Sequence, residues 1–285
     1  MTKLALPAEL EALRADLAAS FDADKPRVMV CMGTGCKACG GDDVLDGVEK
    51  ALKQAKLNRE VELVTTGCRG FCERGTLVAL RPAGTLYCGV EPDDGGDIIG
   101  KTVAHGEVIE RLLYEMPARV PTMPGERIAA EEEIPFYRHQ KRIVLGLNDR
   151  IDPSRIEDYI REGGYGGLAK ALFDMEPDGI IDEVRRAGLR GRGGGGFPTG
   201  QKWKLCRAAE GGVKYVICNA DEGDPGAFMD RSLLEGNPHS VLEGMAIGAR
   251  AIGSSHGYIY IRAEYPLAIK LLRKAIDQMH ERGLL

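Results

Sequence analysis

Two pairs of cysteines have a spacing that could hold a metal centre. Cys31 and Cys36 are separated by four residues, Cys68 and Cys72 by three, and 31 residues lie between the pairs. Each pair follows a strand-like run and lies in a glycine-bearing loop, so four thiolates can converge on one site. Zinc is bound tetrahedrally by thiolates, and an iron-sulfur cluster takes four thiolates, two per iron in its [2Fe-2S] form. The spacing alone is compatible with either zinc or an iron-sulfur cluster.

A further cysteine offers a different interpretation of the first pair. Cys36 and Cys39 form a C-x-x-C motif of the kind that dithiol oxidoreductases use. A working dithiol would leave Cys68 and Cys72 without a role, so we favour the metal site and expect Cys39 to lie close to it as a bystander. Three cysteines remain. We expect Cys88 and Cys218 in the core, and Cys206 has no assigned role.

The stretch from Gly188 to Arg231 combines a glycine loop with a surplus of positive charge. Four consecutive glycines, 193 to 196, allow close approach of a ligand to the backbone, and exposed N–H groups in such a loop can bind an anion. Residues 185 to 214 carry eight Lys or Arg and one acid, Glu210, in a chain of formal net charge -5. The alternative is a flexible linker, but Phe197, Pro198 and Trp203, the single tryptophan, argue against it.

An acidic turn, NADEGDPGAFMDR, follows the next strand-like run, KYVIC. It offers an amide at Asn219 and carboxylates at Asp221, Glu222 and Asp224 to a ligand held by the glycine loop. The alternative is a turn-forming acidic cluster that caps the next helix, and the residues alone leave both interpretations open. His239, beside Pro238, is expected to be a helix-start residue, because no histidine here has ligand spacing.

Length and composition indicate a globular chain of two ordinary domains. The chain has 285 residues, of which 44% are apolar and 28% charged, and its pI is about 5.7. The N-terminus does not resemble a secretory signal, so we expect a cytoplasmic location, where eight cysteines indicate metal or redox chemistry rather than disulfides. No run approaches the roughly 18 apolar residues of a membrane span, and no basic aromatic face suggests nucleic-acid binding.

Hydrophobic periodicity predicts four segments along the chain. An amphipathic helix over residues 4–19 lies in an N-terminal segment, 1–24, and could pack on this chain or on a partner. A compact α/β unit of order βαβββα occupies 25–117, a connector rich in proline and charge spans 118–148, and a second α/β domain covers 149–285. The expected elements of the first unit are strands at 27–32, 61–66, 76–82 and 85–90, and helices at 42–56 and 106–116.

The second domain is expected to begin with helices and to continue as a parallel strand pair. Short helices fall within 152–164, 167–175 and 178–188. After the glycine loop, strands at 214–218 and 257–262 alternate with helices at 238–252 and 266–281, which implies a parallel pair with a helical crossover. Two parallel strands are an unfinished sheet, so we expect the second domain to be incomplete at its C-terminus.

The cysteine pattern resembles a known family. C-x4-C followed after about thirty residues by G-C-x-G-x-C, within a small α/β unit, is similar to the thioredoxin-like [2Fe-2S] ferredoxins that accompany the NADH-oxidising module of respiratory complex I. The resemblance covers residues 25 to 116. It implies that Cys31, Cys36, Cys68 and Cys72 are the ligands of a [2Fe-2S] cluster.

The rest of the chain resembles the flavin-carrying NADH-dehydrogenase subunit of complex I and its relatives in NAD-linked hydrogenases and formate dehydrogenases. GLRGRGGGGFPTGQKW and CNADEGDPGAFMDR carry this resemblance, which runs from about Pro135 to the end. It implies an α/β fold in which a thioredoxin-like ferredoxin domain precedes the first part of an FMN-binding Rossmann-like domain. The residues it implies for FMN and the pyridine nucleotide are Gly191, Arg192, Gly193, Phe197, Lys202, Asn219, Asp221, Glu222 and Asp224.

Three positions depart from the family pattern. Phe197 resembles the aromatic that stacks on the nucleotide, but its usual aromatic partner is Leu205 here, which weakens the clamp. Asp224 stands where respiratory subunits commonly carry Glu; either acid would repel a 2'-phosphate and favour NAD(H). Gly195 replaces a more usual Ala.

The resemblance implies an electron-transfer subunit of a multi-subunit NAD-linked oxidoreductase. Hydride would pass between NAD(H) and FMN, with no catalytic side chain, and single electrons would then pass through iron-sulfur clusters of this and partner subunits. The fusion of a ferredoxin domain with a flavin domain in one chain resembles subunits of hydrogenases, electron-bifurcating ones included, and of formate dehydrogenases. The [4Fe-4S] cluster of this family would belong to a missing C-terminal part. The alternative function is a non-catalytic [2Fe-2S] carrier or partner-binding subunit without a working flavin site.

Overall fold

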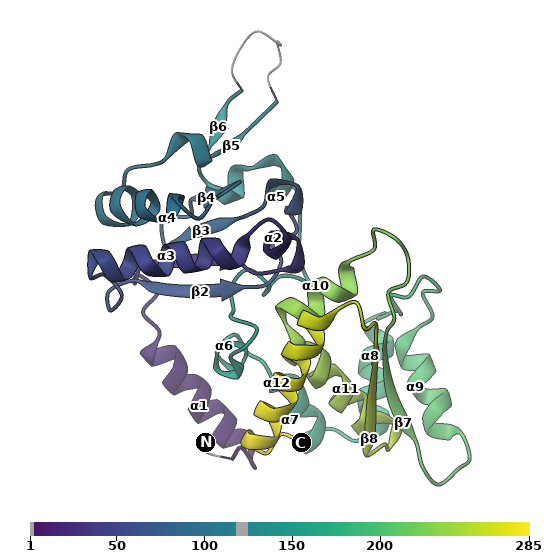
Figure 1. Ribbon diagram of the computed structural model, residues 1–285. Helices are drawn as coiled ribbons and strands as arrows, with labels where there is room; N and C mark the ends of the chain where they lie inside the picture. Colours follow the sequence, from purple (N-terminus) through teal and green to yellow (C-terminus); the bar gives the residue numbers. More distant parts are fainter. Residues whose placement is uncertain (1–2, 118–124) are drawn as a thin grey trace. The chain divides into compact units, whose positions relative to one another are not determined.

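The computed structural model describes residues 3–117 and 125–285, which divide into two compact units (Figure 1). The described residues within 21–153, together with 235–237, form one, here called the cysteine unit. Residues 3–20, 154–234 and 238–285 form the other, here called the glycine-loop unit.

A four-stranded mixed sheet is the centre of the cysteine unit. Its order is β2-β1-β3-β4. Strand β1 (Arg27–Cys31) runs parallel to β2 (Glu62–Thr66) and antiparallel to β3 (Val78–Arg81), which pairs with the short β4 (Leu86–Tyr87). The run RVMVC, apolar after Arg27, is buried at every position because β1 has a neighbour on each side. The predicted strands of this sheet are confirmed, and Gly84, with φ of +76°, lies in the turn between β3 and β4.

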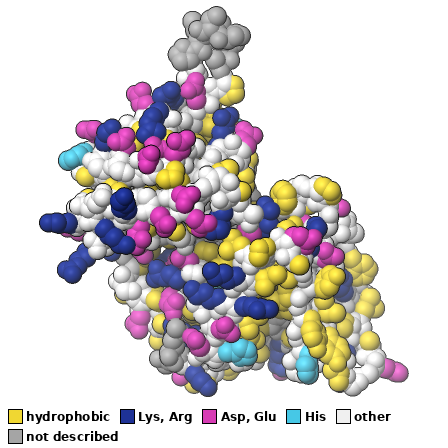
Figure 2. All heavy atoms as spheres, viewed as in Figure 1, with side chains coloured by type: hydrophobic (Ala, Val, Ile, Leu, Met, Phe, Trp, Pro, Cys, Tyr) yellow, Lys and Arg dark blue, Asp and Glu magenta, His cyan; other side chains and the backbone are white. Residues whose placement is uncertain are grey.

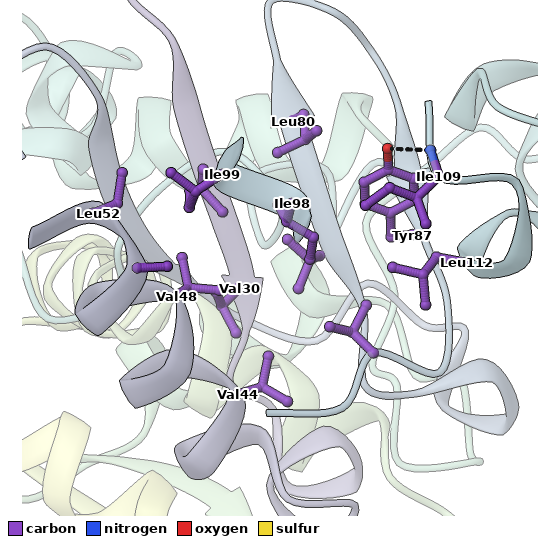
Figure 3. Close-up of a cluster of buried hydrophobic side chains, with 14 of the residues drawn as sticks. Val30, Val44, Val48, Leu52, Leu80, Tyr87, Ile98, Ile99, Ile109 and Leu112 are labelled. Atoms are coloured by element: carbon purple, nitrogen blue, oxygen red, sulfur yellow. Dashed lines mark hydrogen bonds between the residues drawn. The ribbon is translucent and has the colours of Figure 1, made fainter. Parts of the chain in front are cut away.

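The two faces of this sheet pack into separate cores. Val28 and Val30 of β1 lie in one core with the buried side of helix α3 (Figure 3). Met29 and Cys31, which alternate with them, lie in the other core. The first core is closed by a polar contact, because the Tyr87 hydroxyl accepts the backbone N–H of Ile109 at 3.0 Å, drawn as a dashed line in Figure 3.

Helix α3 (Gly41–Ala55) covers the first face with a regular apolar stripe. Its buried residues include Val44, Val48 and Leu52, at the spacing that aligns side chains on one side of a helix. Asp42 and Asp43 in the first turn complement the positive end of the helix. The predicted helix at 42–56 is therefore confirmed.

The last helix of this unit does not lie where the sequence predicted it. Residues 106–116, expected to be helical, form a 3-10 turn, η3 (Glu110–Leu112), and a short strand, β5 (Tyr114–Glu115). The helix comes earlier, as α4 (Asp94–Asp97) continued by the π-helix η2 (Ile98–Val103). Gly95 permits it, because a Cβ there would lie 2.7 Å from the carbonyl carbon of Gly47 on α3. Gly95 resembles a helix breaker in the sequence, but in the structure it allows α4 to pack closely on α3.

Residues 125–153 form part of the cysteine unit. Strand β6 (Arg127–Ile128) pairs with β5, and two short helical turns follow, η4 (Glu131–Glu133) and α5 (Pro135–Arg138). Ile134 and Tyr137 are buried in the same core as Cys31. This segment therefore covers the sheet face that carries the first cysteine pair. Residues 118–124 of the expected connector lie outside the described residues.

Helices and one parallel strand pair make up the glycine-loop unit (Figure 1). Strands β7 (Tyr215–Ala220) and β8 (His256–Ile261) are parallel over six residue pairs, as the sequence predicted. The helices are α1 (Pro7–Ser20), α6 (Ile156–Arg161), α7 (Gly166–Phe173), α8 (Pro177–Arg186), α9 (Thr199–Ala208), α10 (Met229–Gly236), α11 (Pro238–Ile252) and α12 (Pro266–Arg282).

One face of the β7–β8 pair is exposed. Helix α11 packs on both strands, whereas Tyr215, Ile217, Tyr258 and Tyr260 are each at least half exposed. Figure 2 shows apolar side chains gathered over these strands. The mixed α/β fold class is confirmed in both units. Among the described helices, none has the length and apolarity that crossing a bilayer requires.

Candidate functional site

The four predicted cysteine ligands lie at the ends of β1 and β2 and in the segments that follow. Cys31 is the last residue of β1, and Cys36 lies in the short helix α2 (Thr34–Ala38). Cys68 follows β2, and Cys72 begins the 3-10 turn η1 (Cys72–Arg74). Because β1 and β2 are parallel neighbours, both loops leave the same edge of the sheet.

Glycines allow these segments to approach closely. The sulfurs of Cys68 and Cys72 are 3.4 Å apart. A Cβ on Gly33 would lie 2.8 Å from the Cβ of Cys68, and one on Gly35 would lie 3.1 Å from the Cys72 sulfur. Real Cβ atoms essentially never come as close as the Gly33 contact. The loop that holds Cys36 is therefore packed against the loop that holds the second pair.

The first pair shares a proton unequally. A hydrogen bond from Cys36 lowers the pKa of Cys31, although burial and the neighbouring Cys68 oppose this. The same hydrogen bond and burial raise the pKa of Cys36. Backbone N–H groups of Gly33 and Arg69 also favour the Cys31 thiolate. A lowered thiol pKa and nearby N–H donors favour metal binding, because the thiolate is the form that binds a metal.

The other cysteines differ in their surroundings. Cys39 is exposed, and its carbonyl accepts a hydrogen bond from the Thr76 hydroxyl at 3.2 Å. Burial raises the pKa of Cys88 to about 11, as expected of a cysteine at the edge of the core. None of the eight cysteines, all of them in the described ranges, forms a disulfide. Within residues 3–117 and 125–285, no three His, Cys, Asp or Glu side chains are arranged to hold a single metal ion.

The glycine loop is a closed turn with an open surface. The N–H of Gly191 donates to the Phe197 carbonyl at 2.9 Å, and the N–H of Thr199 donates to the Leu189 carbonyl at 2.9 Å, which closes the loop. Cβ atoms on glycines 193, 194 and 195 would meet nothing within 4 Å. Gly194 has φ of +93°, which favours glycine.

Helix α9 begins directly after this loop, at Thr199. The first N–H groups of a helix and its dipole attract anions. Arg192 and Lys202 are exposed on either side of the helix start, and Phe197 is 47% exposed. Loop, helix start and cations together can hold a phosphate group.

The acidic turn lies at the carboxyl ends of β7 and β8, where open α/β sheets bind ligands. Asn219 is in β7, and its side-chain oxygen accepts the N–H of Asp221 at 3.1 Å. The Glu222 carboxylate accepts the N–H groups of Asp230 and Arg231, at 3.0 and 3.2 Å, and so caps α10. Asp221 and Asp224 are exposed. The helix-capping interpretation of the acidic cluster is therefore correct for Glu222.

The structure gathers the predicted residues into three groups. The cysteines form one group in the cysteine unit, and the glycine loop and the acidic turn are two groups in the other unit. Among the described residues, no hydrogen bond joins the glycine loop to the acidic turn.

Sequence reasoning missed a buried polar network in the glycine-loop unit. Glu243 accepts hydrogen bonds from the Tyr159 hydroxyl at 2.5 Å and from the N–H groups of Tyr165 and Leu168, at 2.8 and 2.9 Å. It thereby caps α7 and supports Tyr165, whose φ is +62°. Burial, then the Glu243 charge, raises the pKa of both tyrosines. His239, in the first turn of α11 as predicted, is bonded to Tyr165 in turn. Spacing in the sequence gave no signal of this network.

Comparison with known proteins identifies the C-terminal part. Residues 184–284, from α8 to α12, match the model of one protein family, described as the Nuo51 FMN-binding domain. This match covers about a third of the chain. The match includes the glycine loop, the acidic turn and both strands of the parallel pair.

Two curated relatives agree with this assignment. The NADP-reducing hydrogenase subunit HndC of Solidesulfovibrio fructosivorans is 62% identical over 148 residues, 52% of this chain and 30% of that protein. The NADH-quinone oxidoreductase subunit of Rhizobium meliloti designated F 2 is 48% identical over 143 residues, 50% of this chain and 34% of that protein. The chain thus spans about a third of the length of these curated relatives.

Two solved structures are also similar to this chain, with sequence identities below those of the two relatives above. The thioredoxin-like [2Fe-2S] ferredoxin from Aquifex aeolicus is 26% identical and is covered completely by 33% of this chain, with a TM-score of 0.31. An NAD+-reducing [NiFe]-hydrogenase, crystallised in its air-oxidised state, is 21% identical, with 97% of this chain and 47% of that chain covered and a TM-score of 0.41.

Proposed function

We propose that the chain is the flavin- and [2Fe-2S]-carrying part of a subunit of an NAD-linked oxidoreductase. The observation that carries the proposal is the glycine loop, open above residues 193–195 and followed at once by α9, within the segment that matches the Nuo51 FMN-binding domain. When bound, FMN would exchange hydride with NAD(H) and pass single electrons to iron-sulfur clusters.

The residues of the glycine-loop unit fit FMN. Gly191, Gly193 and the start of α9 would receive the phosphate, because a Cβ on glycines 193 to 195 would occupy the space open to it. Arg192 and Lys202 would offset its charge. Asn219 would bond the ring edge, and Asp221 would accept ribose or amide hydrogens. Glu222 would act on the flavin side by fixing the start of α10.

For the pyridine nucleotide we propose two residues. Phe197 would stack on one ring of the nucleotide, since its side chain is exposed beside the loop. Asp224 would repel a 2'-phosphate and favour NAD(H) over NADP(H). Leu205, which is 56% exposed, would provide apolar contact where an aromatic would give more.

The cysteine unit fits a [2Fe-2S] cluster. Cys31 with Cys36 and Cys68 with Cys72 form two close pairs of sulfurs, and such a cluster takes two thiolates on each iron. N–H donors and a lowered thiolate pKa at Cys31 support the same assignment. We propose these four as ligands and Cys39 as a bystander.

We further propose that the chain works with other iron-sulfur subunits in the cytoplasm. The curated relatives are named as subunits of a hydrogenase and of an NADH-quinone oxidoreductase, which supports a hetero-oligomer. The eight cysteines without a disulfide are typical of a reducing compartment.

Cofactor analysis of the purified protein tests the proposal. We expect about two irons, two acid-labile sulfides and one FMN per chain, with a flavin absorption band that NADH bleaches. Iron without flavin would favour the alternative function, a [2Fe-2S] carrier. Zinc in place of iron would refute the cluster.

Matched variants sharpen this test. Gly193 and Gly194 both have open space above them, but Gly194 alone has a positive φ. Alanine at either position would place a Cβ in the space open to the phosphate and should weaken FMN binding. Gly194→Ala should weaken it about tenfold more than Gly193→Ala, because alanine in the Gly194 conformation costs a further amount of about 1–2 kcal/mol. For the cluster, Cys31→Ser should lose the normal reduced-cluster EPR signal, and Cys39→Ser should retain it.

A further inference from the structure

Arg69 is one of the largest fully buried side chains among the described residues, and it directly follows Cys68 in the chain. Its guanidinium Nη1 lies 2.8 Å from the Glu131 carboxylate and 3.9 Å from that of Asp149, and its Nη2 donates to the Asp149 carbonyl at 3.2 Å. All these residues belong to the cysteine unit. Residues far along the sequence therefore fix the loop that carries the second cysteine pair.

The charges around Arg69 do not balance. Glu131 also pairs with Arg81, and Asp149 also pairs with Arg142 at 2.7 Å. Three guanidinium groups thus share two carboxylates, which leaves one positive charge in excess. Burial alone would raise the pKa of Glu131, but Arg69 and Arg81 outweigh it and lower this pKa, so the carboxylate is ionised. The Nε–H of Arg69 has no acceptor among the described residues.

Arg69 also fixes backbone donors at the cysteine sulfurs. Its own backbone N–H is one of the groups that lower the pKa of Cys31, and the N–H of Gly70, the next residue, donates to the sulfur of Cys68 at 3.3 Å. These two sulfurs belong to different loops. A side chain held at its far end by Glu131 and Asp149 keeps both donors in place.

We propose that Arg69 is a positioning residue that raises the reduction potential of the [2Fe-2S] cluster, an inference that rests on the cluster in the proposed function. Reduction adds one negative charge to the cluster. A buried positive charge within on the order of 10 Å is poorly screened, so it stabilises the reduced form more than the oxidised form. Net charge and hydrogen bonds to sulfur are the features by which proteins set cluster potentials.

Four variants test the proposal in the purified protein. Iron, acid-labile sulfide and the visible spectrum are measured first, and the midpoint potential is then taken from a redox titration followed by EPR. We expect Arg69→Gln to lower the potential, Arg69→Lys to lower it less, and Glu131→Gln to raise it. A charge effect should shift the potential in opposite directions in Arg69→Gln and Glu131→Gln. Loosening of the cysteine loop would instead shift it in the same direction in these two variants.

Arg27→Gln is the matched control. Arg27 is also buried and paired, with Glu62 at 3.1 Å, but it lies at the opposite end of β1 from Cys31, about 13 Å away at 3.3 Å per residue. Its loss should destabilise the unit and leave the potential unchanged.

The outcomes separate the two proposals. Wild-type protein without iron would refute the cluster itself. With the cluster present, an unchanged potential in Arg69→Gln, or shifts of the same sign in Arg69→Gln and Glu131→Gln, would overturn the role of Arg69. If Arg69→Gln does not fold, Arg69→Lys and Glu131→Gln are compared instead, and shifts of the same sign in these two variants would overturn the role of Arg69.

Discussion

Mild acid is expected to destabilise the glycine-loop unit through His239. This side chain is 1% exposed, and its ring nitrogens contact the Tyr165 hydroxyl at 2.6 Å and the Gln278 side-chain oxygen at 3.1 Å. Gln278 donates its amide N–H to the Ser154 carbonyl, so its oxygen accepts from His239, whose other nitrogen accepts from Tyr165. The network therefore holds the neutral imidazole.

The pKa of His239 gives the size of the effect. Burial lowers it from 6.5 to about 4. The unfolded chain then binds a proton near pH 6.5, and the folded chain does not until near pH 4. The stabilisation is complete above pH 6.5 and is lost as the pH falls toward 4. At about 1.4 kcal/mol per pH unit, the full loss is about 3 kcal/mol, and about 2 kcal/mol falls between pH 7 and pH 5.

The assay is urea unfolding at pH 5, 6 and 7 with tryptophan fluorescence as the probe. Trp203 is the single tryptophan, and its ring faces Gly248 on α11, the helix that carries His239. The wild type should lose about 2 kcal/mol more than His239→Gln between pH 7 and pH 5. Other titrating groups contribute equally to both proteins and cancel in the difference.

An exposed histidine in the same unit supplies the control. His280 on α12 is exposed, so His280→Gln should retain the wild-type dependence on pH. Parallel curves of unfolding free energy against pH for the wild type and His239→Gln would refute the reasoning.

Three further predictions concern single side chains. Gly95→Ala should destabilise the cysteine unit by about 1–3 kcal/mol in chemical denaturation, because its Cβ would collide with the backbone of Gly47; equal stability would show that the helices can separate without cost. Glu243→Gln should cost the glycine-loop unit about 1–3 kcal/mol, measured by Trp203 fluorescence, because an amide cannot accept at both ends; an unchanged midpoint would contradict this. Asp224→Asn should raise kcat/KM for NADPH relative to NADH, whereas wild-type protein that uses both equally would refute the role of Asp224.

Much of the fold could be predicted because its signals are local. The run RVMVC is apolar after Arg27 and contains two β-branched valines, and it forms a strand as expected. The alternation of strand and helix after the glycine loop predicted the parallel pair of β7 and β8. The glycine-bearing cysteine loops after two strands also indicated that the thiols would meet, and β1 and β2 are indeed neighbours.

What the sequence could not predict depends on distant partners. Gly95 resembles a helix breaker in the sequence, because its close contact with Gly47 exists only after tertiary packing. Arg69 resembles an ordinary polar loop residue, yet it is buried against Glu131 and Asp149, more than 60 residues away. Glu243 and Tyr159 are separated by 84 residues. In each case the residue type suggests exposure or flexibility, and only the folded chain provides the partner that changes this.

The exposed face of β7 and β8 has a consequence for the handling of this protein. Among the described residues the two strands pair only with each other, so each has an outer edge with unpaired N–H and C=O groups. Tyr215, Ile217, Tyr258 and Tyr260 add an exposed apolar surface beside these edges. Exposed apolar edges of this kind are templates for strands of other molecules. Aggregation on heating is therefore expected to begin here, and a lysine at Ile217 or Tyr260 should delay it.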